Sequence, residues 1–217
     1  MRNYFDQQLA LLNEEMTQMG ALCEDAIALA VKALAEDSPT LAAKVPPIAA
    51  ALDQKERDVE GICLKLLLRQ QPVAGDLRQI SAALKMITDM ERIGDQAEDI
   101  AEIVGYLEGC GEAHCALLSA MARATISMVT DSVDAYVRQD LSLAQAVIEY
   151  DDVVDEAFCR VKGTLIAMIA QNTADGEYAL DLLMIAKYFE RIGDHAVNIA
   201  GWVEFSVTGE HKNDSMQ

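Results

Sequence analysis

A five-residue string, Glu-Arg-Ile-Gly-Asp, occurs twice in the chain, at 91–95 and again at 190–194. The two copies are 99 residues apart, which is close to half the length of the 217-residue chain. The likeness continues beyond the string, since Ile100-Ala101 corresponds to Ile199-Ala200. Self-similarity at a fixed offset is typical of a repeated structural unit, so the sequence predicts one unit that is present twice.

Both copies carry the periodicity of an amphipathic α-helix. Apolar residues recur at three- and four-residue steps, the spacing of one helical face. In the first copy this face comprises Ile80, Ala83, Leu84, Ile87, Met90, Gly94, Ala97, Ala101 and Val104. Gly94 and Gly193 each cost a helix about 1 kcal/mol relative to alanine, and we expect another backbone to approach closely there. Arg92 and Gln96 are predicted to point away from the apolar face.

Acidic residues follow the edge of this face at four-residue spacing. Like charges at this spacing cost a helix about 0.2–0.5 kcal/mol per pair, so the pattern indicates a function that offsets the cost. The first copy has Glu91, Asp95, Glu98 and Glu102 along this edge, and the second copy has Glu190 and Asp194.

The composition indicates an all-α protein and excludes several functions. Hydrophobic residues make up 52% of the chain but aromatic residues only 5%, which favours helices over sheets. A net charge of −19 argues against nucleic-acid binding and suits cations or a basic protein partner. Neither a signal peptide nor a membrane span is recognisable, so we expect a soluble, cytoplasmic protein. Five cysteines without a CxxC pair favour free thiols over disulfides or a thiolate zinc site.

The order of helices predicts two tandem, pseudo-symmetric three-helix bundles with antiparallel neighbours. Asp37-Ser38-Pro39 ends the first helix, and Val45-Pro46-Pro47 delays the second. We expect repeat 1 at 1–108, a connector at 109–115 where the bundles meet, repeat 2 at 116–207 and a frayed tail at 208–217. The six helices are predicted at about 3–37, 47–71, 76–108, 112–139, 142–171 and 175–207.

The middle helix of each repeat carries an acid pair of its own, Glu56 with Glu60 and Asp151 with Asp155, related by an offset of 95. A carboxylate that faces a core is costly unless it is paired, protonated or bound to a metal. Oxygen-only ligands suit hard or borderline cations. We therefore predict one metal site from Glu56, Glu60, Glu91 and Asp95, and a second from Asp151, Asp155, Glu190 and Asp194, with Glu98, Asp99 and Asn198 as outer ligands.

An alternative is that basic residues neutralise these acids by salt bridges; the candidates are Lys55, Arg57, Lys85 and Arg92. His195 points about 100° away from Asp194 on a helix, which favours a surface histidine over a ligand. A phosphate-binding loop, a Ser/His/Asp set and a Cys/His set are all absent from the sequence. We therefore assign no catalytic residues and expect a protein that is not an enzyme.

The stretch Arg69-Gln70-Gln71-Pro72-Val73-Ala74-Gly75-Asp76-Leu77-Arg78, followed by Met90–Asp95, resembles the signature of the PhoU family. The segment Tyr188–Ala200 is similar to that family's second repeat, and the resemblance covers essentially the whole chain. A second glutamine before Pro72 is a small departure that affects only the local turn.

The resemblance implies a cytoplasmic regulator of phosphate uptake, built from six helices in two bundles and often dimeric. In the family, E/DxxxD motifs bind clusters of metal ions, with iron or zinc reported and magnesium or manganese plausible. The implied partners are the histidine kinase PhoR and the ATPase subunit PstB of the phosphate ABC transporter, and the implied output is repression of the phosphate-starvation regulon. Two alternatives remain, namely an accessory protein of a different phosphate permease and a metal-dependent hydrolase.

Overall fold

The computed structural model describes residues 2–70, 72–107, 109–171 and 176–210, and within these ranges the regular structure is entirely helical. Six long helices and one short helix follow one another: α1 (Arg2–Ala35), α2 (Pro39–Ala42), α3 (Val45–Gln70), α4 (Ala74–Val104), α5 (Glu112–Arg138), α6 (Leu141–Gln171) and α7 (Gly176–Thr208). The predicted all-α class and the six long helices are confirmed.

Local sequence explains where the helices begin and end. Ser38 caps α2, because its side chain accepts a hydrogen bond from the Leu41 backbone N–H at 3.3 Å and Pro39 follows it. Helix α3 begins at Val45 rather than at Pro47, since prolines are tolerated in a first turn, where the backbone N–H groups have no helical acceptor. Gln139 ends α5 in the left-handed conformation, with φ of 52°.

The predicted ends of the repeats differ from the observed ones by a few residues. Helix α4 ends at Val104, four residues before the expected end at Glu108, which itself lies outside the described residues. Helix α5 begins at Glu112, so the last part of the expected 109–115 connector is helical. Of the expected tail at 208–217, Thr208 still belongs to α7, and 211–217 lie outside the described residues.

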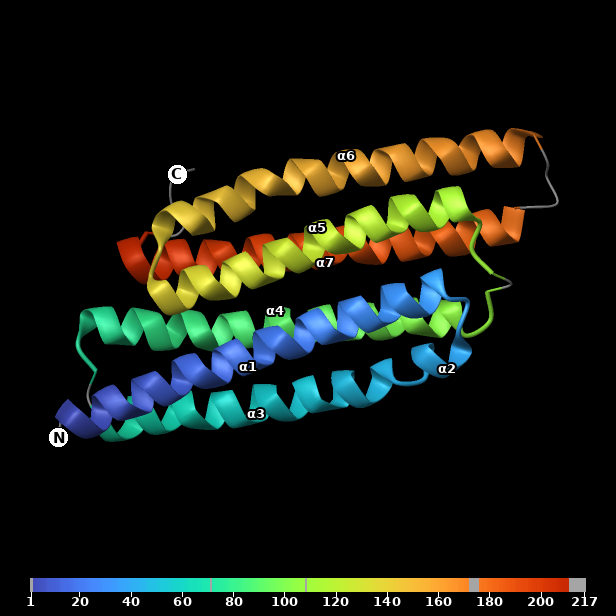
Figure 1. Cartoon of the computed structure of the whole chain (residues 1–217). Helices are drawn as coiled ribbons and strands as arrows, with labels where there is room; N and C mark the ends of the chain where they lie inside the picture. Colours follow the sequence, from blue (N-terminus) through green and yellow to red (C-terminus); the bar gives the residue numbers. More distant parts are fainter. Residues whose placement is uncertain (1, 71, 108, 172–175, 211–217) are drawn as a thin grey trace.

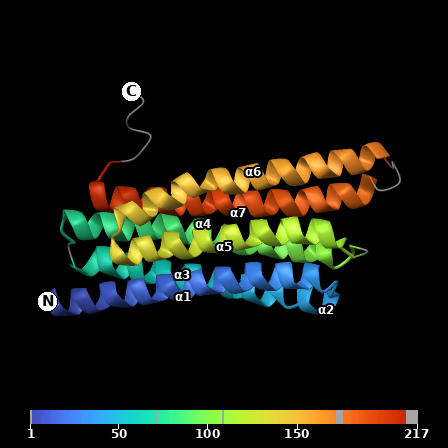
Figure 2. The same cartoon turned by 45° about the horizontal axis from the view of Figure 1, so that its top comes forward.

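The helices form two three-helix bundles that lie side by side along their full length (Figure 1). Helices α1, α3 and α4 form one bundle and α5, α6 and α7 form the other, with successive long helices antiparallel (Figure 2). Helix α4 packs on α7 and α1 on α5, while α3 and α6 lie on the outside. The expectation that the bundles meet near the connector is therefore wrong, because the contact extends along the length of four inner helices.

Burial on two sides distinguishes the inner helices from the outer ones. Buried apolar side chains from both bundles form one continuous hydrophobic core. Gln96, predicted to point away from the core, is only 4% exposed, since α4 is covered by its own bundle on one side and by the other bundle on a second side. A periodicity argument that considers a single bundle misses this second covered face.

The contact between α4 and α7 follows a pseudo-two-fold axis. Asp89 on α4 accepts hydrogen bonds from Asn198 at 3.1 Å and contacts His195 Nδ1 at 2.9 Å, both on α7. Tyr188 on α7, which corresponds to Asp89, in turn donates a hydrogen bond to Asp99 on α4. Asp99 corresponds to Asn198 at the same offset of 99 residues. The repeated units thus exchange equivalent contacts, as two-fold symmetry requires.

The two glycines of the repeated string do allow close packing, but against side chains rather than backbone. A Cβ atom on Gly94 would lie 2.6 Å from Leu52 Cδ1, and one on Gly193 would lie 3.1 Å from Asp151 Oδ1. Gly94 therefore sets how closely α3 packs on α4 and which residues of the two helices lie opposite one another. Gly193 does the same for α6 on α7.

Within the described residues, the long helices are too polar for any of them to qualify as a membrane span.

Replacing Gly94 with alanine should destabilise the protein. The buried Leu52 cannot move away freely, and overpacking a core costs about 1–3 kcal/mol, which exceeds the gain of about 1 kcal/mol in helix propensity. Gly61→Ala is the matched control, because nothing lies within 4 Å of a Cβ there. Thermal and urea unfolding should show a loss of stability for Gly94→Ala and a gain for Gly61→Ala; equal effects would contradict this packing.

Candidate metal centres

In the first bundle, three carboxylates from two helices converge. Asp53 on α3 and Glu91 and Asp95 on α4 place their oxygen atoms within 4.8 Å of one another, and all three residues are partly buried. Glu91 and Asp95 belong to the predicted metal site, whereas Asp53 was not predicted. Three carboxylates at this distance form the kind of oxygen ligand set that hard cations prefer.

The other two predicted residues of this site lie further along α3. Glu56 accepts a hydrogen bond from Thr88 Oγ1 at 3.2 Å, and Glu60 is exposed. The reason is the antiparallel register. Leu52 lies against Gly94, so Asp53 lies within the oxygen group of the α4 acids. Glu56 is one turn further along α3, where its charge still acts on Glu91, and Glu60 is two turns further.

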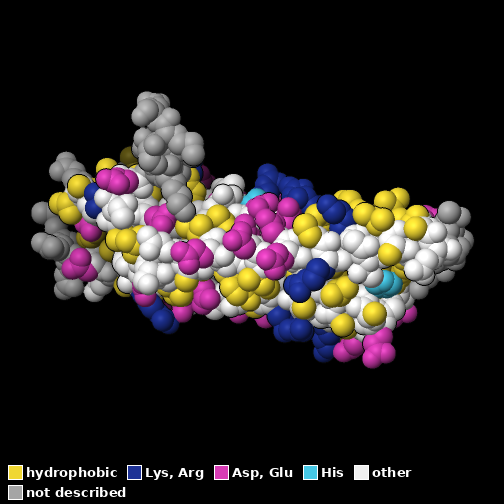
Figure 3. All heavy atoms as spheres, turned by 90° about the horizontal axis from the view of Figure 1, so that it is seen from above, with side chains coloured by type: hydrophobic (Ala, Val, Ile, Leu, Met, Phe, Trp, Pro, Cys, Tyr) yellow, Lys and Arg dark blue, Asp and Glu magenta, His cyan; other side chains and the backbone are white. Residues whose placement is uncertain are grey.

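In the second bundle, the four predicted carboxylates lie on α6 and α7 near enough for their charges to act on one another. Asp151 lies against Gly193, and burial, followed by the charges of Asp155, Asp194 and Glu190, raises its pKa to about 6. Burial and the neighbouring Glu190 likewise raise the pKa of Asp194. Seen from the side of α6, acidic side chains gather near the middle of the molecule, with Lys and Arg side chains beside them (Figure 3).

We call the two groups of carboxylates the acidic seams: Asp53, Glu91 and Asp95 in the first bundle, and Asp151, Asp155, Glu190 and Asp194 in the second. The two seams occupy equivalent places in the repeats but do not use equivalent residues. The buried residues of α3 recur in α6 at the predicted offset of 95, whereas α4 and α7 are related by 99. This difference of about one turn places a leucine, Leu52, beside the first glycine and a carboxylate, Asp151, beside the second.

Salt bridges neutralise part of each seam, as the alternative interpretation predicted. Arg92 contacts Glu91 at 3.4 Å and Asp95 at 3.1 Å, and Lys187 contacts Glu190. Arg92 is the only residue of the predicted cations with a described ion pair to a seam acid, since Lys55 pairs with Glu15 instead. One cation in each seam does not balance three or four carboxylates.

The pKa of Glu91 shows that the first seam keeps a net negative charge. Burial raises the pKa of Glu91, and Asp95 raises it further, while Arg92 acts in the opposite direction. Groups whose pKa values rise in this way are destabilised when ionised, and a bound cation removes that penalty. The donor set of the first bundle therefore fits a metal ion. In the second bundle the carboxylates act on one another through their charges, but within the described residues their oxygen atoms do not gather as closely as those of Asp53, Glu91 and Asp95.

The residues proposed as outer ligands lie in different places. Glu98 is next to the first seam, since burial and the charge of Asp95 raise its pKa. Asp99 and Asn198 are engaged in the contact between α4 and α7 with Tyr188 and Asp89. His195 is not a surface histidine as expected, because its side chain is only 17% exposed and pairs with Asp89 across the two bundles.

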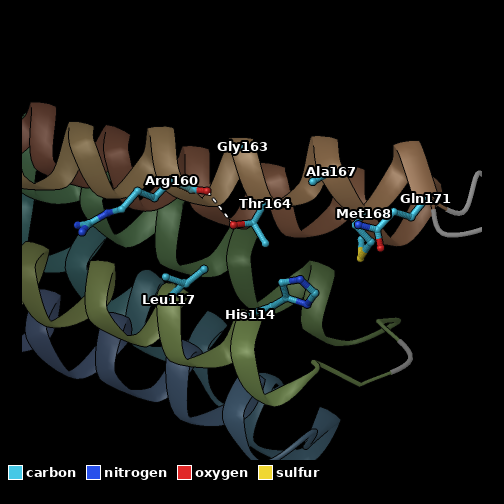
Figure 4. Close-up of a pocket in the computed structure, with 8 residues that line it drawn as sticks. All are labelled: His114, Leu117, Arg160, Gly163, Thr164, Ala167, Met168 and Gln171. Carbon is cyan, nitrogen blue, oxygen red and sulfur yellow. Dashed lines mark hydrogen bonds between the residues drawn. The ribbon is translucent and has the colours of Figure 1, made fainter.

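A groove of about 740 Å³ lies between α5 and α6, away from the acidic seams (Figure 4). Its polar groups do not converge, because the Arg160 side chain points along α6 away from the His114 ring. The remaining lining residues are Leu117, Gly163, Thr164, Ala167, Met168 and Gln171. This arrangement defines no ligand class.

The free cysteines at the connector, Cys110 and Cys115, are partly buried, whereas Cys159 is exposed. Burial raises the pKa of the Cys110 thiol to about 12, which keeps it protonated at neutral pH.

Comparisons with known proteins identify relatives along the whole chain. A family model described as the PhoU domain matches residues 16–104 and, a second time, residues 118–203. The phosphate-specific transport system accessory protein PhoU homolog of Clostridium acetobutylicum is 32% identical over 213 residues, covering 96% of each chain. The homolog of the same name from Synechocystis sp. is 34% identical over 214 residues, covering 97% of this chain and 94% of that protein.

Solved structures show the same fold. The crystal structure of PhoU from Pseudomonas aeruginosa superposes with a TM-score of 0.89 at 32% identity, covering 95% of this chain and 100% of the other. The phosphate transport system regulatory protein PhoU from Streptococcus pneumoniae superposes with a TM-score of 0.86 at 25% identity, covering 95% and 98%.

Asp53→Asn should reduce metal binding in the first bundle, whereas Glu60→Gln should not, because only Asp53 shares the carboxylate group with Glu91 and Asp95. Metal content by mass spectrometry of the purified variants and thermal melts with and without chelator measure this. A ligand at a hundredfold excess over its dissociation constant stabilises a fold by about 2.7 kcal/mol, and this stabilisation should fall in Asp53→Asn. The same loss in Glu60→Gln would contradict the placement.

Without metal, Asp151 should make stability depend on pH. Folding raises the pKa of Asp151 from 3.8 to about 6, so the folded state holds this proton more tightly than the unfolded chain. The resulting contribution to the free energy of unfolding is fully present below pH 3.8 and is lost as the pH rises through about 6. Asp151→Asn removes this ionisation. In chelator, the stability of Asp151→Asn relative to wild type should therefore increase between pH 4 and pH 7. A difference that stays constant across this range would show that Asp151 is not destabilised by its neighbours.

Proposed function

The chain belongs to the PhoU family, and from this membership we propose that it is an accessory protein of a phosphate-specific transport system that restrains phosphate uptake. The observation that carries the proposal is the match to relatives of that description over more than nine tenths of both chains. Two PhoU domains occur in one fold, so the likeness concerns the whole architecture rather than one motif.

In more detail, we propose a cytoplasmic adaptor that contacts two proteins, a PhoR-like sensor histidine kinase and the PstB-like ATPase subunit of the phosphate ABC transporter. Through these contacts it represses the phosphate-starvation regulon when phosphate is plentiful. A net charge of −19 supports binding to basic surfaces of proteins and disfavours nucleic acid. Membrane association then occurs only through the partners, and we propose that the adaptor is a homodimer.

The adaptor is proposed to hold metal ions in its two acidic seams. Asp53, Glu91 and Asp95 would supply ligands in the first seam. Asp151, Asp155, Glu190 and Asp194 would do so in the second, where their charges act on one another. Iron, zinc, manganese and magnesium all accept carboxylate oxygen. A bound cation supplies positive charge that links an outer helix to an inner one.

We propose regulation rather than catalysis. Metal-dependent hydrolysis is the enzymatic alternative, and it needs a general base or a nucleophile beside the metal. The seams offer carboxylates, Arg92 and Lys187, and the nearest histidine, His195, is paired with Asp89. A different phosphate permease as the transport partner remains a second candidate, and a permease gene next to that of this chain would favour it.

Deleting the gene should derepress phosphate-starvation genes in medium rich in phosphate, because the kinase and the transporter lose their inhibitor. An alkaline phosphatase reporter measures this, and a plasmid copy of the wild-type gene should restore repression. A plasmid copy with Glu91→Ala and Asp95→Ala tests whether the first seam is needed. An unchanged reporter in the deletion strain, with no second gene of the family present, would refute the proposed function.

A further inference from the structure

A small apolar groove lies where the short helix α2 packs beside α4. Its volume is about 290 Å³. The floor and walls come from small or apolar residues of α2, α4 and the first turn of α3, namely Pro39, Ala42, Ala43, Pro46, Ala101 and Gly105. Helix α2 exists because Ser38 and Pro39 start a new helical turn immediately after α1, and this detour produces the groove.

Two glutamates, Glu98 and Glu102, form the lip of the groove. Neither forms an ion pair with any residue that the structure describes. Burial raises the pKa of Glu98, and so do the acidic charges beside it, including Asp53 and Asp95 of the first seam. Glu98 and Glu102 therefore extend the negative charge of the first seam to the edge of the groove.

The surface that follows Glu102 along the chain also carries an apolar side chain and acidic neighbours. Tyr106 follows Glu102 by one turn of chain and is 61% exposed, which is unusual for an aromatic side chain. Glu102, Asp181 and Glu177 all act on its hydroxyl, so the acids of α7 lie close to it. An exposed aromatic side chain next to an apolar groove is typical of a protein-binding surface, and the acids around it favour a basic partner.

We propose that this groove and Tyr106 together receive a basic, amphipathic segment of a partner protein. Lysine or arginine side chains of that segment pair with Glu98 and Glu102, and its apolar side chains fill the groove and cover Tyr106. Charge complementarity identifies the occupant, because Glu98 and Glu102, which have no ion pair among the described residues, favour basic side chains and a free cation would leave the apolar floor exposed. The inference rests on the proposed function, to which it adds the docking surface.

Binding to the purified ATPase subunit of the phosphate transporter from the same organism tests this, with the purified kinase as a second probe. Titrations in chelator exclude any contribution from metal ions. Glu98→Gln with Glu102→Gln should weaken binding roughly tenfold and reduce its dependence on salt, because paired charges at an interface act through screened attraction. Ala43→Trp fills the groove without changing charge and should also weaken binding.

The matched control is Glu14→Gln with Glu149→Gln, which removes the same charge from exposed positions outside the groove. It should retain the wild-type affinity. If the wild type binds and the groove variants bind equally well, or if the control loses as much affinity as the lip variant, the docking surface is wrong and the proposed function stands. If the wild type binds neither purified partner, the proposed function fails and this inference fails with it.

A photo-crosslinking residue in place of Tyr106 supplies a second readout in the same purified mixtures. The crosslinked partner peptide should contain several lysines or arginines with interspersed apolar residues. A crosslink to an acidic or uncharged segment would overturn the proposal even if the affinities behaved as expected.

Discussion

The close packing of each outer helix on a glycine of the repeated string is the constraint on which both acidic seams depend. Gly94 sets the level of α3 through Leu52, and Gly193 sets the level of α6 through Asp151. Carboxylates can converge only if these levels agree to within a turn, because each helix advances about 1.5 Å per residue. The glycines lie between Glu91 and Asp95 in one copy and between Glu190 and Asp194 in the other, so the same short string supplies the ligands and the spacing.

Much of this was predictable from sequence, since the repeat and its helical period fix the class, the six long helices and the acids of α4 and α7. The set of carboxylates in the first seam was not, because periodicity gives the face of a helix but not its level along a neighbour. Glu60 and Asp53 are both acids on α3, and only the contact of Leu52 with Gly94 decides between them. That contact could have been inferred by pairing the glycine with the bulkiest apolar residue opposite it.

Gln96 and His195 show a second limit of sequence reasoning. Both lie on a face that is polar by the period of a single bundle, yet one is buried and the other pairs with Asp89. The other bundle covers this face, and association between two units of the same chain leaves only a weak mark on hydrophobic periodicity. The equivalence of 89 with 188 and of 99 with 198 is the signal that was available, because equivalent residues meet across a two-fold axis.

The continuous core also bears on the history of the chain. Each unit buries one face of its inner helices only against the other unit, and the contacts that join them, such as Asp89 with His195 and Tyr188 with Asp99, come in symmetric pairs. An ancestor with one unit would have left that face open to water unless two identical chains covered it together. Duplication of such a unit would join into one polypeptide an association between two chains, and each copy could then diverge, as Leu52 and Asp151 differ here.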